Sequence, residues 1–302
     1  MQRRNAMMLV LVVAGCADSP VARRLPGVFL DDTSRAGLAS ANPTPQCGYD
    51  YYRDDRDDVP GAPPTLQHQV TTFLYDQDGL ITADYDVDDS GARVYSETIR
   101  YNAMGQPVQR SVLKPDGGTA EYYNVYDSFG LVVRRSLDSN GDGVDDGFTV
   151  YRYGPDHQRL SAHTERSGGF VIDDVYSYDE MGRTSKVVNT STEEELTFTI
   201  AYTYDDAAHT MNGIGTKSSG VYYTGVTTYN SDDLIESDAS TYMDPSSGAV
   251  TSTSTTTNTY KGKDMISALW VWASPPSDSS PGRKITERAE YHYGDCQRDP
   301  SR

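Results

Sequence analysis

Residues 138–146 have the composition of this chain best suited to hold a metal ion. The segment reads Asp-Ser-Asn-Gly-Asp-Gly-Val-Asp-Asp, so side chains that carry oxygen recur at alternate positions. Ca²⁺ takes about six to eight oxygen ligands, and glycine at Gly143 permits the sharp bend that would bring them together. We therefore predict a weak Ca²⁺ site. Its ligands would be Asp138, Asn140, Asp142, the backbone carbonyl of Val144, and Asp146.

The spacing of these residues resembles the first nine positions of an EF-hand calcium loop. The resemblance ends at the twelfth position, where Thr149 stands in place of the bidentate glutamate. Either the affinity is weak or another loop completes the ligand shell. The alternative interpretation is an ordinary acidic β-turn.

Catalytic motifs are absent from the sequence. The five histidines share no metal-binding spacing, and no nucleophile elbow, paired-cysteine motif or phosphate-binding loop occurs. Acidic residues are frequent but fall mostly in turns, where aspartate has a structural role. We therefore predict that the protein is not an enzyme. A carbohydrate-active enzyme with two facing carboxylates remains a minor alternative.

Two tryptophans near the C-terminus could bind a ligand by stacking. Trp270 and Trp272 alternate with Val271, so both indoles lie on one face of a strand. They predict either a stacking platform or a cap that covers the last edge of a sheet.

The N-terminus predicts export. Residues 1–15 contain Arg3 and Arg4, then an apolar stretch too short to span a bilayer, and then small residues before Cys16. The sequence Val-Ala-Gly-Cys resembles a bacterial lipobox, which implies that Cys16 carries a lipid and anchors the chain to a membrane. By resemblance to lipoprotein sorting rules, Ala17 after the cysteine favours the outer membrane, on its periplasmic or cell-surface face.

The two other cysteines form an even pair in an oxidising compartment. Cys47 and Cys296 flank most of the chain, and we predict a disulfide between them. The net charge of −18 argues against nucleic acid as a partner.

A repeat organises the chain between these cysteines. Its anchor is Tyr-[Asp/Asn]-x-x-Gly, and the anchor tyrosines recur every 25 to 27 residues. Clear copies begin at Tyr75, Tyr101, Tyr126 and Tyr178, and weaker ones at Tyr153, Tyr204 and Tyr229; two further copies, at Tyr260 and Tyr293, follow longer steps of 31 and 33 residues.

Each copy predicts a β-hairpin. Apolar and aromatic residues alternate with polar ones before the tyrosine, which is typical of a strand with one buried face. Aspartate or asparagine then opens the turn, and glycine adopts positive φ beside a bulge. We expect an all-β fold of about sixteen to eighteen antiparallel strands in a meander, which form a curved open sheet, partial barrel or spiral.

The anchor and its period resemble the RHS/YD-repeat family. The resemblance covers roughly residues 65–295, most of the mature chain, and implies a coiled β-sheet. This chain has too few repeats for a large shell and lacks the family's C-terminal core motif, so its self-cleaving and toxin-enclosing roles are not carried over. We expect residues 16–64 to be a lipidated tether and residues 297–302 a tail.

Together these features predict a membrane-anchored lipoprotein that acts as a structural or binding module. Its partners would be a polysaccharide or a surface protein, reached from a lipid anchor in the membrane. An accessory of a toxin or cell-contact system is the alternative that the family resemblance implies.

Overall fold

Eighteen β-strands make up the described part of the chain. The computed structural model describes residues 46–57, 65–76, 80–114, 117–192, 196–276, 282–294 and 296. The predicted lipid-bearing Cys16 and the predicted signal peptide therefore lie outside the described residues. The strands are β1 Gln46–Asp57, β2 Thr65–Tyr75, β3 Ile81–Asp88, β4 Arg93–Tyr101, β5 Pro107–Leu113, β6 Thr119–Tyr126, β7 Val132–Asp138, β8 Gly147–Tyr153, β9 Arg159–Arg166, β10 Phe170–Tyr178, β11 Thr184–Ser191, β12 Leu196–Asp205, β13 Thr210–Lys217, β14 Gly220–Tyr229, β15 Ile235–Met243, β16 Val250–Lys261, β17 Asp264–Ser274 and β18 Arg283–Tyr293.

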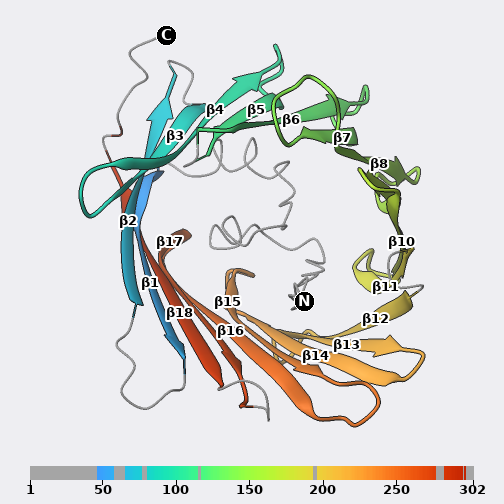
Figure 1. Ribbon diagram of the computed structural model, residues 1–302. Coiled ribbons are helices and arrows are strands. Elements are labelled where there is room, and N and C mark those ends of the chain that lie inside the picture. The colour runs from blue at the N-terminus through green and yellow to red at the C-terminus, as the bar shows by residue number, and fades with distance from the viewer. Residues whose placement is uncertain are drawn as a thin grey trace, which may run out of the picture.

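The strands form one antiparallel meander that closes on itself. Each strand pairs with its neighbours in sequence, and β1 also pairs with β18, so the sheet is a ring (Figure 1). The predicted all-β fold, antiparallel pairing and strand number are confirmed. The expectation of an open sheet is wrong, because β1 and β18 join in register over almost their whole length and leave no free edge.

A tyrosine hydroxyl links eight of the nine anchors to an earlier strand. The anchor tyrosine near the end of an even-numbered strand donates to a backbone carbonyl 19 to 29 residues earlier in the chain. Each such bond contributes about 0.5–1.5 kcal/mol to stability, so the anchor tyrosine fastens its hairpin to the preceding part of the sheet. The pairs are Tyr75–Gln46, Tyr101–Ile81, Tyr126–Pro107, Tyr153–Val132, Tyr178–Arg159, Tyr204–Thr184, Tyr260–Ile235 and Tyr293–Met265.

The residue after the tyrosine builds the turn. In the third copy one carboxylate oxygen of Asp127 accepts the backbone N–H groups of Phe129 and Leu131, both at 2.9 Å. Gly130 then takes a left-handed conformation with φ of 84°. The strand register shifts at the same place, as the predicted bulge requires.

The two faces of the barrel wall differ in burial. Apart from Ser136 and Asp138, the buried side chains of the described residues lie on the face that carries the anchor tyrosines, among them Phe73, Val187 and Trp270. Side chains on the inside of a closed barrel converge, and the pocket described below hollows this same face. The tyrosine face is therefore the inner one.

The body begins earlier than predicted. We expected the repeat domain to start at residue 65 and the preceding segment to be a tether, but β1 spans Gln46–Asp57 and contacts both β2 and β18. Tyr49 and Tyr51 alternate with Asp50 and Tyr52, and they pack inward beside Phe73 and Tyr291. The abundance of aspartate in this segment hid its period of two. The described residues contain no apolar helix long enough to cross a bilayer.

Candidate functional site

A pocket opens on the inner face where the tyrosine-anchored turns of four successive hairpins meet. It has a volume of about 710 Å³ and is lined by residues between β8 and the turn after β14. Its walls combine aromatic rings, two arginines, three carboxylates and two histidines. The lining includes Tyr153, Tyr176, Tyr178, Tyr204, Tyr229, Arg159, Arg183, Asp205, Asp206, Asp233, His157 and His209.

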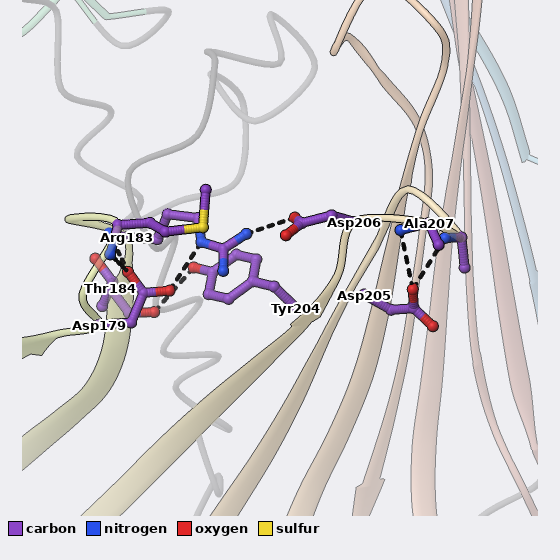
Figure 2. A network of polar contacts seen from close by, with 9 residues as sticks. Asp179, Arg183, Thr184, Tyr204, Asp205, Asp206 and Ala207 are labelled. Carbon is purple, nitrogen blue, oxygen red and sulfur yellow. Dashed lines mark hydrogen bonds and ion pairs between the residues drawn. The ribbon is translucent and has the colours of Figure 1, made fainter.

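Arg183 is the centre of a polar network at the edge of this pocket. Its Nε lies 2.8 Å from Asp179 Oδ2, and its Nη1 lies 2.5 Å from Asp206 Oδ1, so the guanidinium joins two neighbouring turns (Figure 2). Its Cζ also lies 4.1 Å from the ring centre of Tyr204. The hydrogen bonds that Arg183 donates to Asp179 and Asp206 hold the pKa of Arg183 above its ordinary value. A charged guanidinium therefore rests on an aromatic face inside the pocket.

Arg159 repeats this arrangement one hairpin earlier. Its Cζ lies 4.6 Å from the ring centre of Tyr151 and 5.9 Å from that of Tyr176. Burial raises the pKa of Tyr176 to about 12, so this phenol stays neutral at physiological pH. The guanidinium groups of Arg159 and Arg183 thus both lie over tyrosine rings, as expected because an aromatic face attracts positive charge.

Turn geometry places the carboxylates at the pocket. Asp205 Oδ1 accepts the backbone N–H groups of Ala207 and Ala208, and Asp206 follows it with its carboxylate turned toward Arg183 (Figure 2). Asp233 occupies the left-handed position of its turn, with φ of 59°. His157 and His209 take the equivalent left-handed positions of their turns, with φ of 61° and 50°.

Sequence reasoning missed this site. It identified Tyr153, Tyr204 and Tyr229 as weaker anchors; the turns after them lack the anchor glycine, and His157, His209 and Asp233 take the left-handed conformation there. These three departures fall within four successive copies, of which only the one at Tyr178 keeps its glycine, and the side chains of all three residues line one pocket. The clustering of turns without glycine in this part of the chain was the signal available in the sequence.

The predicted calcium loop is held together by its own backbone. The two carboxylate oxygens of Asp138 accept N–H groups from residues 140 to 143, the shortest being those of Gly141 and Gly143 at 2.7 Å. Burial raises the pKa of Asp138, but these donors outweigh it and leave the pKa below its ordinary value. Asp146 Oδ2 accepts from the backbone and side chain of Ser139.

The other predicted ligands also bond within the loop. Asn140 Oδ1 accepts from the N–H of Asp142, and Asp142 Oδ1 accepts from the N–H of Val144. Within the described residues, no group of three histidine, cysteine or acidic side chains is arranged to hold a metal ion. The loop thus has the hydrogen bonds of an acidic turn, and Ca²⁺ binding stays a prediction.

The remaining predicted residues fall at two other places in the barrel. Cys47 and Cys296 are joined by a disulfide across the β1–β18 seam, with Cα atoms 4.7 Å apart. Trp270 is buried on the inner face and donates from Nε1 to Ser254 Oγ at 2.8 Å. Since β17 lies between β16 and β18, Trp270 and Trp272 have no sheet edge to cap.

Comparisons with known proteins return fold similarities alone. No family model matches the chain and no curated protein matches it, so membership of the RHS/YD-repeat family stays a prediction. A porin-like protein from Bacteroides uniformis is 12% identical, with 83% of this chain and 98% of that chain covered and a TM-score of 0.37. A mutant porin of Rh. blastica is 8% identical, with 81% of this chain and 98% of that chain covered and a TM-score of 0.38. The Tc holotoxin pore of Photorhabdus luminescens is 11% identical, with 74% of this chain but only 16% of that chain covered and a TM-score of 0.30.

The predicted function and partners are wrong. We expected an open sheet, tethered by a lipid, that presents its faces to a polysaccharide or surface protein, or that serves a toxin or cell-contact system. The sheet is instead a closed 18-stranded barrel, joined through β1 and β18. Its aromatic face points to its own axis. A closed antiparallel barrel with an even number of strands does fit the predicted outer-membrane location.

Proposed function

We propose that the protein works through its lumen, where the pocket between β8 and β14 binds a small organic cation. The contact of Arg183 with Tyr204 carries this proposal, because it places a guanidinium on a pocket ring at 4.1 Å. Five tyrosines line the pocket, and a cation over a tyrosine face gains about 0.5–2 kcal/mol. An amine or guanidinium of the right size would use the same faces.

Charge favours the same ligand class. Three aspartates outnumber the two arginines in the pocket lining, and the whole chain carries a net charge of −18. An acidic field raises the local concentration of cations and speeds their entry. We further propose that the site binds its ligand without chemistry, since Asp205 serves its turn and Asp206 pairs with Arg183.

A thermal-shift titration with organic cations tests the proposal. Arginine methyl ester, spermidine and tetramethylammonium are added at constant ionic strength, with glutamate as the anionic control. A ligand at about ten times its dissociation constant should raise the melting temperature by roughly 2–4 °C. Equal effects of cations and glutamate, or none, would refute a cation site.

The repeat supplies a matched control variant. Tyr204 and Tyr126 are equivalent anchors whose hydroxyls each bond to a carbonyl at 2.8 Å, but only Tyr204 lines the pocket. Tyr204→Leu and Tyr126→Leu should therefore lower stability alike. Tyr204→Leu alone should weaken cation binding, by roughly two- to fivefold for one exposed aromatic contact.

A channel across the outer membrane is the second candidate, and closure of the sheet favours it. Barrels of about 16 to 18 strands leave an aqueous passage, and a closed barrel has no unpaired edge to expose to lipid. The outward-facing side chains decide whether such a barrel could lie in lipid. Among the described residues, those in the middle of the strands from β12 to β17 are uncharged and rich in threonine. From β18 through β1 to β11, the outward-facing side chains include charges of both signs, such as Arg134, Asp173 and Arg288.

Conductance separates the two candidates. Each arginine or lysine at the lipid-facing midplane costs about 2–4 kcal/mol, so the charged wall opposes insertion of a single barrel. Purified protein is added to planar bilayers and to liposomes, which are then washed with alkaline carbonate. Discrete conductance steps and carbonate-resistant protein would establish the channel. Cation binding by protein that washes off would instead support a binding barrel.

A further inference from the structure

One carboxylate on the outer wall contacts two histidines at the seam where the barrel closes. Asp50 on β1 lies 3.1 Å from Nε2 of His68 on β2 through Oδ1, and 2.7 Å from Nε2 of His292 on β18 through Oδ2. Asp50 thereby connects three strands from opposite ends of the chain. The disulfide between Cys47 and Cys296 crosses the same seam.

The contacts of His68 require a protonated ring. Its second nitrogen, Nδ1, lies 2.7 Å from Oδ1 of Asp89, which follows β3. A neutral imidazole has one N–H donor, so it can donate to only one of these two carboxylates, whereas an imidazolium donates to both. The full set of contacts therefore exists only when His68 is charged.

The surrounding charges reinforce this requirement. On β18, Glu290 stands directly across from Asp50 and adds a second negative charge to the same face. Arg288 lies 3.5 Å from Glu290 and also covers the ring of Tyr52, which stacks on His68 with ring centres 4.6 Å apart. The other facing groups are Asp54 on β1 and His292 on β18.

We propose that the outer face of the β18–β1–β2 seam is a protonation-dependent clasp, in which imidazolium at His68, shared with Asp50 and Asp89, strengthens closure of the barrel. The hydrogen bond to Asp89 raises the pKa of His68 above its ordinary value, burial opposes that rise, and Asp50 adds to it. A group whose folded pKa is raised stabilises the fold fully below its ordinary pKa of 6.5, and this contribution is lost as the pH rises through the folded pKa. The seam is thus tightest in mildly acidic solution and loosens in alkaline solution.

Hydrogen exchange of the full chain at pH 5.5 and 8.5 tests the clasp, with rates corrected for intrinsic exchange. Amides of β1 and β18 should exchange roughly two- to fivefold faster at the higher pH, the effect of one partly exposed ion pair, while those of β12 to β14 stay unchanged. Because the disulfide could mask opening, the measurement is repeated on the Cys47→Ser/Cys296→Ser double variant, where the same ratio should appear.

Two variants decide the assignment. Asp50→Asn should strongly reduce the pH dependence of seam exchange, because His68 then keeps a carboxylate partner only at Asp89, which lies outside β1 and β18. His163 provides the control, because Asp173 at 2.6 Å and Glu165 at 3.0 Å hold it in the same way on β9 and β10, away from the seam. His163→Gln should leave the pH dependence of the seam intact. The proposal fails if seam and β12–β14 respond alike to pH, or if Asp50→Asn keeps the wild-type response.

Discussion

The hydroxyl of Tyr126 donates to the carbonyl oxygen of Pro107 at 2.8 Å, and so ties the third repeat to the second. Tyr126→Phe removes this hydrogen bond and keeps the ring. We expect a loss of about 0.5–1.5 kcal/mol in the free energy of unfolding, measured by urea denaturation. Tyr123→Phe is the control, since Tyr123 lies on the outer face by its register with Ser136. An equal loss in both variants would mean that the hydroxyl of Tyr126 has no special role.

One carboxylate oxygen of Asp127 accepts two backbone hydrogen bonds within the turn. Asp127→Ala should therefore cost about 1–3 kcal/mol, measured by the same denaturation. The chain itself contains the matched control, because Asn102 and Asn230 make the same pair of bonds in their turns. Asp127→Asn should thus be nearly neutral, and a large loss in that variant would show that charge, not geometry, matters at this position.

Asp233 occupies a left-handed conformation that glycine adopts without strain. Asp233→Gly should raise stability by about 0.5–1 kcal/mol, and with it the melting temperature. Asp232→Gly serves as control because its φ is not positive, and it should give no gain. If the pocket binds cations, Asp233→Gly should also weaken that binding, so the two readouts move in opposite directions.

Asp244 gives the fold a defined acid response. Hydrogen bonds from the side chain and N–H of Ser246 and from those of Ser247 lower its pKa to about 2 from an ordinary 3.8. A group with a depressed folded pKa stabilises the fold above its ordinary pKa, and this contribution is lost as the pH falls through the folded pKa. Wild type should therefore melt above Asp244→Ala at pH 5, and the gap should close between about pH 4 and pH 2. A gap independent of pH would refute the carboxylate as its cause.

Calcium titration tests the loop at residues 138–146. If it binds Ca²⁺, millimolar Ca²⁺ should raise the melting temperature and Asp142→Ala should abolish the rise, with Mg²⁺ at equal ionic strength as control. An acidic turn without metal predicts no shift with either ion. Asp138→Ala should destabilise the protein in both cases, since its carboxylate holds four backbone N–H groups.

Local sequence determined the hairpins of this protein. Alternating side chains set each strand, and the tyrosine, aspartate and glycine of each anchor set the turn and its bulge. These effects act within a few residues, so the strands and turns can be predicted from the sequence without knowledge of the rest of the fold. The same reading missed β1, whose aspartates disguise its alternation, and it placed the start of the body at residue 65 in place of Gln46.

Only the tertiary structure decided that the sheet closes and what the closure encloses. The pairing of β1 with β18 joins segments about 250 residues apart, and it depends on the summed curvature and stagger of all eighteen strands, which no single repeat encodes. The curvature of the closed sheet turns the tyrosine face inward, and the turns of four successive hairpins line one pocket on that face. It also brought Asp50 between His68 and His292, a contact that the spacing of histidines in the sequence could not show.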